Sequence, residues 1–253
     1  MKKIVIYLTL AAALTAACGQ RTDHAPHDDD SQAVSLQQSL PGDSAIYGLA
    51  CDGCTDSVLV FLPYKGGDPD TFDIIEARQQ HRIYGRPHIG DELAVMLNPA
   101  DSDEVRMLVN AEMLKGTWCY QVQPRLRHIG DMPKRMQRRM LERIPDSVRQ
   151  RWMQPREYTL RLKRDNSASH YGTLHRQTTT DDMSPVQYPV VTHYTEWRLY
   201  NGRLILKADT IAGFSAKGDT PRIDTADIKL LRKDSLVLRF ADHDLSLYKK
   251  KSS

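Results

Sequence analysis

Two cysteines separated by two residues, Cys51 and Cys54, are the residues of this sequence whose types and spacing best suit them to chemistry. Such a pair supports three kinds of chemistry: thiol–disulfide exchange, metal ligation and a structural disulfide. In a redox site the first cysteine lies at the N-terminus of a helix, which lowers the pKa of its thiol. Here the strand-like residues "SVLVFLP" follow the pair, so redox catalysis is not expected. A disulfide and a metal site both stay open.

A metal site would need ligands beyond Cys51 and Cys54. The other candidates are Cys119, His81 and His88, and thiolate ligands of this kind suit Cu(I) or Zn(II). The stretch "LACDGCTDSV" is similar to the cysteine pair near the start of an outer-membrane copper-responsive lipoprotein family, although this resemblance carries no activity. The alternative is a Cys51–Cys54 disulfide that staples the loop between two strands.

The fourth cysteine, Cys18, follows a segment typical of protein export. The positive residues 1–3 precede an apolar run at 4–14 that is too short to span a bilayer. Small residues then lead into Cys18, an arrangement that resembles a bacterial lipobox. The resemblance implies a signal peptide at 1–17, a diacylglyceryl thioether on Cys18, further acylation (palmitate) of the new amino terminus, and an outer-membrane location. A plain secretory signal is the alternative.

Residues 18–43 predict a lipidated cysteine followed by a flexible tether, because they contain few large apolar residues. The acidic run 28–30 within it resembles a surface-export signal of lipoproteins in one Gram-negative phylum. A solvated linker is an equal interpretation. The membrane, reached through the lipid anchor, is therefore an expected partner.

Charge is spread unevenly over the 253 residues, whose formal net charge is +3. Between residues 125 and 164 there are thirteen Lys or Arg and four Asp or Glu. A block of this kind is usually a solvated face, and an exported protein meets little nucleic acid, so no nucleic-acid partner is expected. Anionic lipid headgroups are the polyanions that such a block would contact.

The spacing of short strands predicts an all-β protein with two parts. Residues 44–111 contain about five short strands and no long helix, which favours a small β-barrel or sheet of the OB or SH3 kind. Residues 112–250 contain about eight more strands, among them the alternating segment 156–162 and a hairpin with Asn201-Gly202 at its tip. Eight antiparallel strands are enough to close a small barrel.

The second part resembles lipocalin-type barrels. Gly116 and Trp118 match the Gly-x-Trp signature of the first lipocalin strand, in which glycine permits a bend and the indole plugs the closed end. The resemblance implies a cation–π contact between Trp118 and an arginine near the last strand, for which Arg239 is the candidate. The phrases "WRLYNGRLIL" and "LRKDSLVLR" are similar to lipocalin-like lipoproteins of gut bacteria.

An amphipathic helical insertion is expected at 131–154, after the first barrel strand. Apolar residues recur there at helical spacing, among them Met136, Met140 and Trp152. Such a face either packs on the barrel or forms a basic lid over its mouth, where methionines adapt to a ligand.

No catalytic constellation is found, and histidines such as His170 are interpreted as core or surface residues. The protein is therefore expected not to be an enzyme and to need no cofactor. The sequence predicts a lipid-anchored cell-envelope protein that holds a small apolar ligand or mediates envelope contacts. The alternative is an envelope-stress or copper- or zinc-sensing lipoprotein that works through Cys51 and Cys54.

Overall fold

The computed structural model describes residues 40–126, 132–172, 186–189, 191–208 and 222–250. All of them belong to one compact unit, which spans Ala33–Ser253. They form two β-barrels that follow one another along the chain, so the all-β class is confirmed. Cys18 and its tether up to residue 39 lie outside the described residues.

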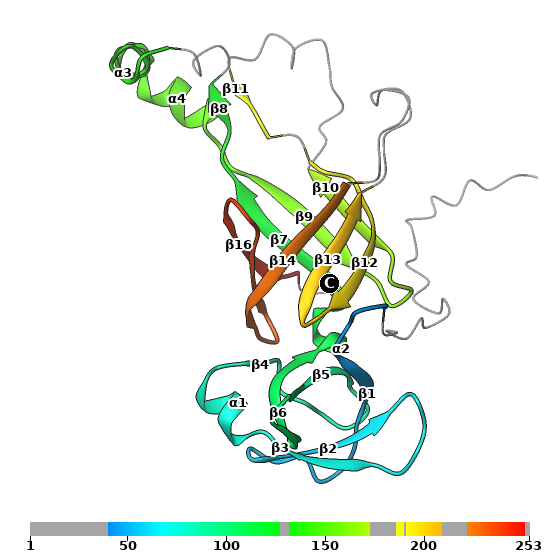
Figure 1. The fold of residues 1–253 in the computed structure, drawn as a ribbon. Helices are drawn as coiled ribbons and strands as arrows, with labels where there is room; N and C mark the ends of the chain where they lie inside the picture. Colours follow the sequence, from blue (N-terminus) through cyan, green and yellow to red (C-terminus); the bar gives the residue numbers. More distant parts are fainter. Residues whose placement is uncertain (1–39, 127–131, 173–185, 190, 209–221, 251–253) are drawn as a thin grey trace, which may run out of the picture. The chain divides into compact units, whose positions relative to one another are not determined.

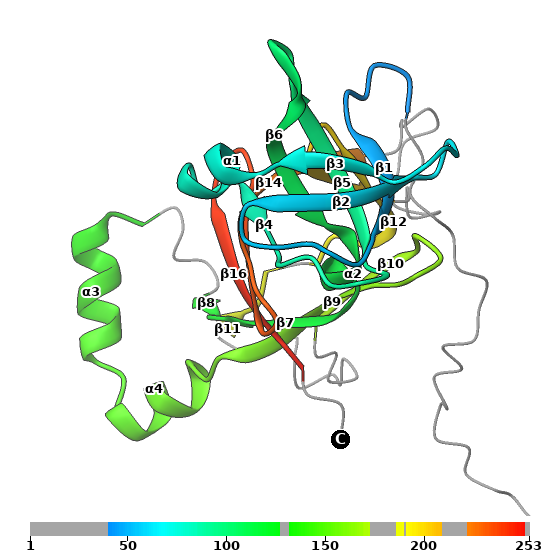
Figure 2. The same cartoon turned by 90° about the horizontal axis from the view of Figure 1, so that it is seen from below.

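The first barrel is closed by five strands (Figure 2). Antiparallel pairs join β1 to β2 and β5, β2 to β3, and β5 to β6, while a parallel pair between β3 and β6 closes the barrel. Helix α1 lies between the third and fourth of these strands, an OB-type connectivity. The elements are β1 (Ile46–Ala50), β2 (Val58–Pro63), β3 (Asp70–Asp73), α1 (Ile75–Gln79), β5 (Glu92–Asn98), β6 (Asp101–Asn110) and the two-residue β4 (Ile83–Tyr84) beside β6.

Strand β5 is buried on both faces, which explains its unbroken apolar sequence. Leu93 and Val95 point into the core of the first barrel. Ala94 and Met96, on the opposite face, join a second core that includes the eight-stranded barrel. Strand β5 of the first barrel therefore contributes to two cores, one on each of its faces, which is the packing expected of a continuous hydrophobic run.

The second barrel has eight antiparallel strands in the order β10-β9-β7-β16-β15-β14-β13-β12 (Figure 1). Its edge strands β10 and β12 meet through a bridge between Ser167 and Glu196 and a 2.8 Å hydrogen bond from the Trp197 amide to the Asn166 carbonyl, which nearly closes the cylinder. Its strands are β7 (Gly116–Val122), β9 (Arg156–Leu162), β10 (Ala168–Gly172), β12 (Tyr194–Tyr200), β13 (Arg203–Ala208), β14 (Arg222–Leu231), β15 (Ser235–Arg239) and β16 (Asp244–Lys249).

The turn between β12 and β13 is the predicted Asn-Gly hairpin. Asn201 and Gly202 have φ values of 48° and 72°, the positive pair that a tight antiparallel turn requires. A Cβ on Gly202 would lie 2.5 Å from both Met96 and Met107 of the first barrel. Glycine is therefore needed here for close packing as well as for the turn.

Short elements complete the chain. Asn110 caps α2 by accepting a 3.0 Å hydrogen bond from the Met113 amide. The insertion expected at 131–154 forms two helices between β8 and β9, interrupted at Pro145. These elements are α2 (Ala111–Leu114), β8 (Arg125–Leu126), α3 (Lys134–Glu142), α4 (Asp146–Trp152) and β11 (Val186–Gln187), which pairs with β8.

Candidate functional site

One end of the eight-stranded barrel is packed solid around Trp118. Its indole is fully buried and donates a 2.7 Å hydrogen bond to the Leu114 carbonyl of α2. Trp197 is equally buried, and leucines from six strands fill the space around them. Because indole N–H groups are costly to bury without an acceptor, the α2 carbonyl fixes where the indole lies. Neither Trp118 nor Trp197 is among the residues that line the two cavities described below.

The predicted contact between Trp118 and Arg239 is wrong. The cation over the indole is Lys249, whose Nζ lies 5.0 Å from the ring centroid. Strand β16 pairs Trp118 with Lys249 at one end and Arg239 with Asp244 at the other. Five residues of strand separate these pairs by about 17 Å. Arg239 instead forms a bidentate pair with Asp244, with Nε 2.7 Å from Oδ1.

Gly116 leaves the space in which Lys249 lies over the Trp118 indole. Its φ of 130° is one that side-chain-bearing residues rarely adopt, and a Cβ would lie 2.8 Å from Lys249 Cε. Lys249 also donates a 3.3 Å hydrogen bond to the Met113 carbonyl, and burial lowers its pKa. The Gly-x-Trp motif therefore makes room for a lysine that crosses the indole.

The opposite end of the barrel contains a cavity of about 1330 Å³. Its inner wall consists of aromatic and aliphatic side chains from five strands, namely Tyr120, Tyr158, Leu160, His170, Tyr194 and Leu206. Its rim carries charges of both signs, including Arg125, Arg203, Arg222, Asp224, Asp227, Arg239 and Asp242. A volume of this size accommodates a small organic molecule.

His170 is the most constrained polar residue of this cavity. Its Nδ1 lies 3.0 Å from the Thr192 carbonyl, which can only accept, so Nδ1 carries the proton. Nε2 then accepts a 2.7 Å hydrogen bond from the Tyr120 hydroxyl. Burial lowers the pKa of His170 to about 4, and the imidazole is therefore neutral at pH 7. No motif or spacing in the sequence distinguishes His170 from the other histidines.

Tyr194 extends the same wall. Its ring stacks on His170 with a centroid distance of 5.5 Å and an interplanar angle of 9°. Its hydroxyl donates a 2.8 Å hydrogen bond to Asp224, which also accepts from Arg222. Burial raises the pKa of Tyr194, as it raises that of Tyr120 to about 12, so both hydroxyls stay protonated at neutral pH.

This arrangement is suited to binding. The polar atoms of His170, Tyr120 and Tyr194 are held by neighbours, and all three residues line the cavity. Rings presented in this way stack on planar groups, while tyrosine oxygens accept hydrogen bonds.

The residues expected to form a lid are placed elsewhere by the structure. Met136 is 55% exposed, Trp152 is half-buried, and the side chain of Met140 lies outside the described residues. Neither Met136 nor Trp152 is among the residues that line the barrel cavity.

The cysteine pair forms part of a tight loop. The thiols of Cys51, Cys54 and Cys119 are free. Cys54 Sγ accepts a 3.4 Å hydrogen bond from the Val60 amide and lies 3.3 Å from the Cys51 carbonyl. Cys119 is buried on β7 of the second barrel, where burial raises its pKa. Over the described ranges, no group of three or more His, Cys, Asp or Glu side chains is placed to hold a metal ion.

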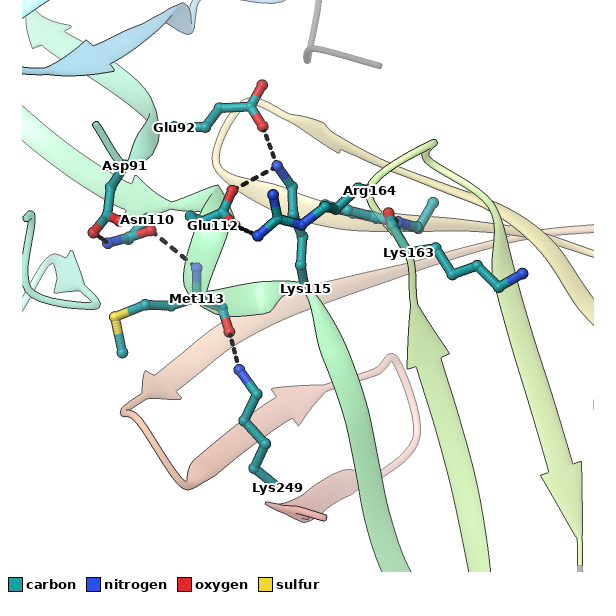
Figure 3. A network of polar contacts seen from close by, with 10 residues as sticks. Asp91, Glu92, Asn110, Glu112, Met113, Lys115, Lys163, Arg164 and Lys249 are labelled. Carbon is teal, nitrogen blue, oxygen red and sulfur yellow. Dashed lines mark hydrogen bonds and ion pairs between the residues drawn. The ribbon is translucent and has the colours of Figure 1, made fainter. Parts of the chain in front are cut away.

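A buried ionic network that the sequence analysis missed links the two barrels (Figure 3). The ammonium of Lys115, which is only 7% exposed, donates hydrogen bonds of 2.7 Å to Glu92 and 2.8 Å to Glu112. Glu112 also accepts a 2.7 Å hydrogen bond from Arg164. Glu92 lies on β5 and Glu112 on α2, whereas Lys115 directly precedes β7 and Arg164 follows β9. Because these positions are far apart in the chain, only the folded structure reveals the cluster.

Comparison of the chain with family models, curated proteins and solved structures finds no match. Among the described helices, none has the length and apolar character needed to cross a membrane. The cavity of the eight-stranded barrel is therefore the main evidence on function.

Proposed function

We propose that this protein is a lipid-anchored cell-envelope binding protein whose eight-stranded barrel holds a small, largely apolar ligand at its open end. The observation that carries the proposal is the unfilled half of the barrel interior. Trp118 and its buried neighbours fill one half, whereas the other half opens into a cavity of about 1330 Å³, whose lining also includes Arg203 and Arg239 at outward-facing positions of their strands. A barrel with a purely structural role would gain stability by filling that space with side chains.

The lining favours a planar ligand with a polar end. Tyr120, Tyr158, His170 and Tyr194 offer aromatic faces, and Leu160 and Leu206 offer an aliphatic surface. The charged rim would lie beside the polar end of the ligand. The lining is therefore partly polar, because the tyrosines and the histidine contribute to it.

The anchor and the membrane contact complete the proposal. Acylation of Cys18 would tether the protein, since more than one acyl chain gives stable attachment. Exposed arginines on α3, namely Arg135, Arg138 and Arg139, would then meet anionic lipid headgroups. Arg138 forms an ion pair with Glu142 at 3.1 Å, whereas Arg135 and Arg139 form none within the described ranges, so two of the three charges are available.

A matched pair of variants on β16 tests the binding proposal. Leu245 lines the cavity, whereas its neighbour Ser246 is exposed on the other face of the strand. The neutral fluorophore N-phenyl-1-naphthylamine is titrated into residues 33–253. Binding should weaken about tenfold in Leu245→Trp and stay unchanged in Ser246→Trp, because only the first change fills the cavity. Equal binding by the two variants, or no binding by the wild type, would overturn the proposal.

A further inference from the structure

A second cavity of about 410 Å³ lies outside the eight-stranded barrel's interior. One bank comes from the first barrel, from the cysteine loop and the segment between α1 and β5. The other bank comes from the end of β14 and the residue after it. Both banks belong to the same compact unit, and none of the residues that line this cavity lines the barrel cavity.

The rim of this second cavity is strongly cationic. Arg78 and Arg86 contribute from the first barrel, and Lys229 and Arg232 contribute from the other bank. All four side chains belong to exposed residues. One carboxylate, that of Asp56, lines the same cavity. Four cations against one anion leave an excess of positive charge that attracts an anionic group.

Asp56 pairs with Arg78 and approaches Arg86, so the four cations of the rim keep a net excess of three positive charges over this carboxylate. Its carboxylate lies 2.6 Å from the Arg78 guanidinium and 3.9 Å from that of Arg86. Arg78 also donates a 3.0 Å hydrogen bond to the Asp56 carbonyl, which fixes its orientation at the rim. Within the described part of the chain, the side chain of Arg232 makes no ion pair, so its guanidinium has its donors available for a ligand.

The inner surface of the cavity is apolar. Ile74 and Leu231 are 2% and 5% exposed, and Ile83 and Tyr84 are half-buried beside them. Gly85 allows this close approach, because a Cβ there would lie 2.8 Å from Asn110 and 3.4 Å from Leu231. A cationic rim above an apolar floor matches a molecule with an anionic head and a short apolar body.

We propose that this second cavity binds an amphipathic oxyanion, with a phosphate or carboxylate held by the arginines of the rim and an apolar chain against Ile74 and Leu231. Guanidinium groups bind such oxyanions through paired, charge-assisted hydrogen bonds, which favours them over lysine alone. The proposal does not depend on the barrel cavity.

Hexyl phosphate, inorganic phosphate and hexanol are the probes that test the proposal, by isothermal titration calorimetry on the full chain in a neutral maltoside detergent. Hexyl phosphate should bind with a dissociation constant of about 1 mM or below, and the other two should bind at least about tenfold more weakly. Its affinity should fall as salt concentration rises, because the cations lie at the surface. Equal binding of hexanol, equal binding of inorganic phosphate, or no binding of hexyl phosphate would each overturn the proposal.

A matched pair of variants assigns the binding to this cavity. Arg232→Gln removes a rim cation, and Lys65→Gln removes an exposed cation from the loop between β2 and β3. Arg232→Gln should weaken hexyl phosphate binding about threefold to tenfold, while Lys65→Gln should leave it unchanged. Equal effects of the two variants would overturn the assignment. Leu245→Trp should leave hexyl phosphate binding intact, so failure of the barrel proposal and failure of this one are distinguishable.

Discussion

The neutral, buried state of His170 predicts a specific dependence of stability on pH. In the unfolded chain a histidine takes up a proton as the pH falls through its ordinary pKa of 6.5, whereas in the folded protein the pKa is about 4. Between these values the unfolded state binds more protons, so stability decreases as the pH falls from 6.5 to 4. The contribution of the neutral His170 to the free energy of unfolding is fully present above pH 6.5.

The size of the effect follows from the two pKa values. Each pH unit between them corresponds to about 1.4 kcal/mol, which gives about 3 kcal/mol in full, most of it already lost at pH 4.5. His170 is only 9% exposed, so solvent screening reduces this figure little. A loss of this size is a large part of the stability of a typical domain.

Urea unfolding at pH 7.5 and pH 4.5 measures the effect in the wild type and in His170→Gln. Glutamine can donate to the Thr192 carbonyl or accept from Tyr120, and it does not titrate. The carboxylates are the same in both proteins. The change in the free energy of unfolding between pH 7.5 and pH 4.5 therefore differs between wild type and variant only by the contribution of His170. The wild type should lose about 2–3 kcal/mol more than the variant. Equal losses in wild type and His170→Gln would refute the reasoning.

Three further substitutions test the packing. Gly116→Ala should lower the free energy of unfolding by about 1–3 kcal/mol in thermal or urea unfolding, because φ is positive there and Lys249 must move; an unchanged stability would contradict the account. Gly202→Ala should destabilise by a similar amount, about 1–3 kcal/mol, and a shift below 0.5 kcal/mol would show that the hairpin relaxes freely. Lys115→Met should cost about 3–5 kcal/mol by leaving the Glu92 carboxylate buried without its ammonium, and adding Glu92→Leu should recover much of it; a double variant as unstable as the single one would argue against the ion pair.

Local sequence signals predicted the elements whose causes are themselves local. The Asn201-Gly202 turn, the alternating strand Arg156–Leu162 and a helical insertion after the first barrel strand all form as expected. The isoleucines of residues 71–85 favour a strand by composition, yet these residues form the end of β3, helix α1 and the short β4. Ile74 is the N-cap residue of α1, Ile75 lies within α1 and Ile83 lies in β4, so composition alone does not separate helix from strand here.

The site depended on strand register, which the sequence does not reveal. Arg239 was chosen because it lies near the last strand, but the strand that neighbours Trp118 is β16, and its residue opposite the indole is Lys249. Likewise, His170 becomes distinctive only when β10 places it beside Tyr120 of β7 and Tyr194 of β12. Contacts between strands so far apart in the chain carry no short-range pattern.

Native mass spectrometry of the full chain, extracted from its own host membrane in a mild detergent, tests the central claim most directly. The proposal predicts a small organic molecule that copurifies with the wild type and with Ser246→Trp and is lost from Leu245→Trp. Spectra without any such adduct in the wild type, or with the same adduct in all three proteins, would contradict a ligand in the open half of the barrel.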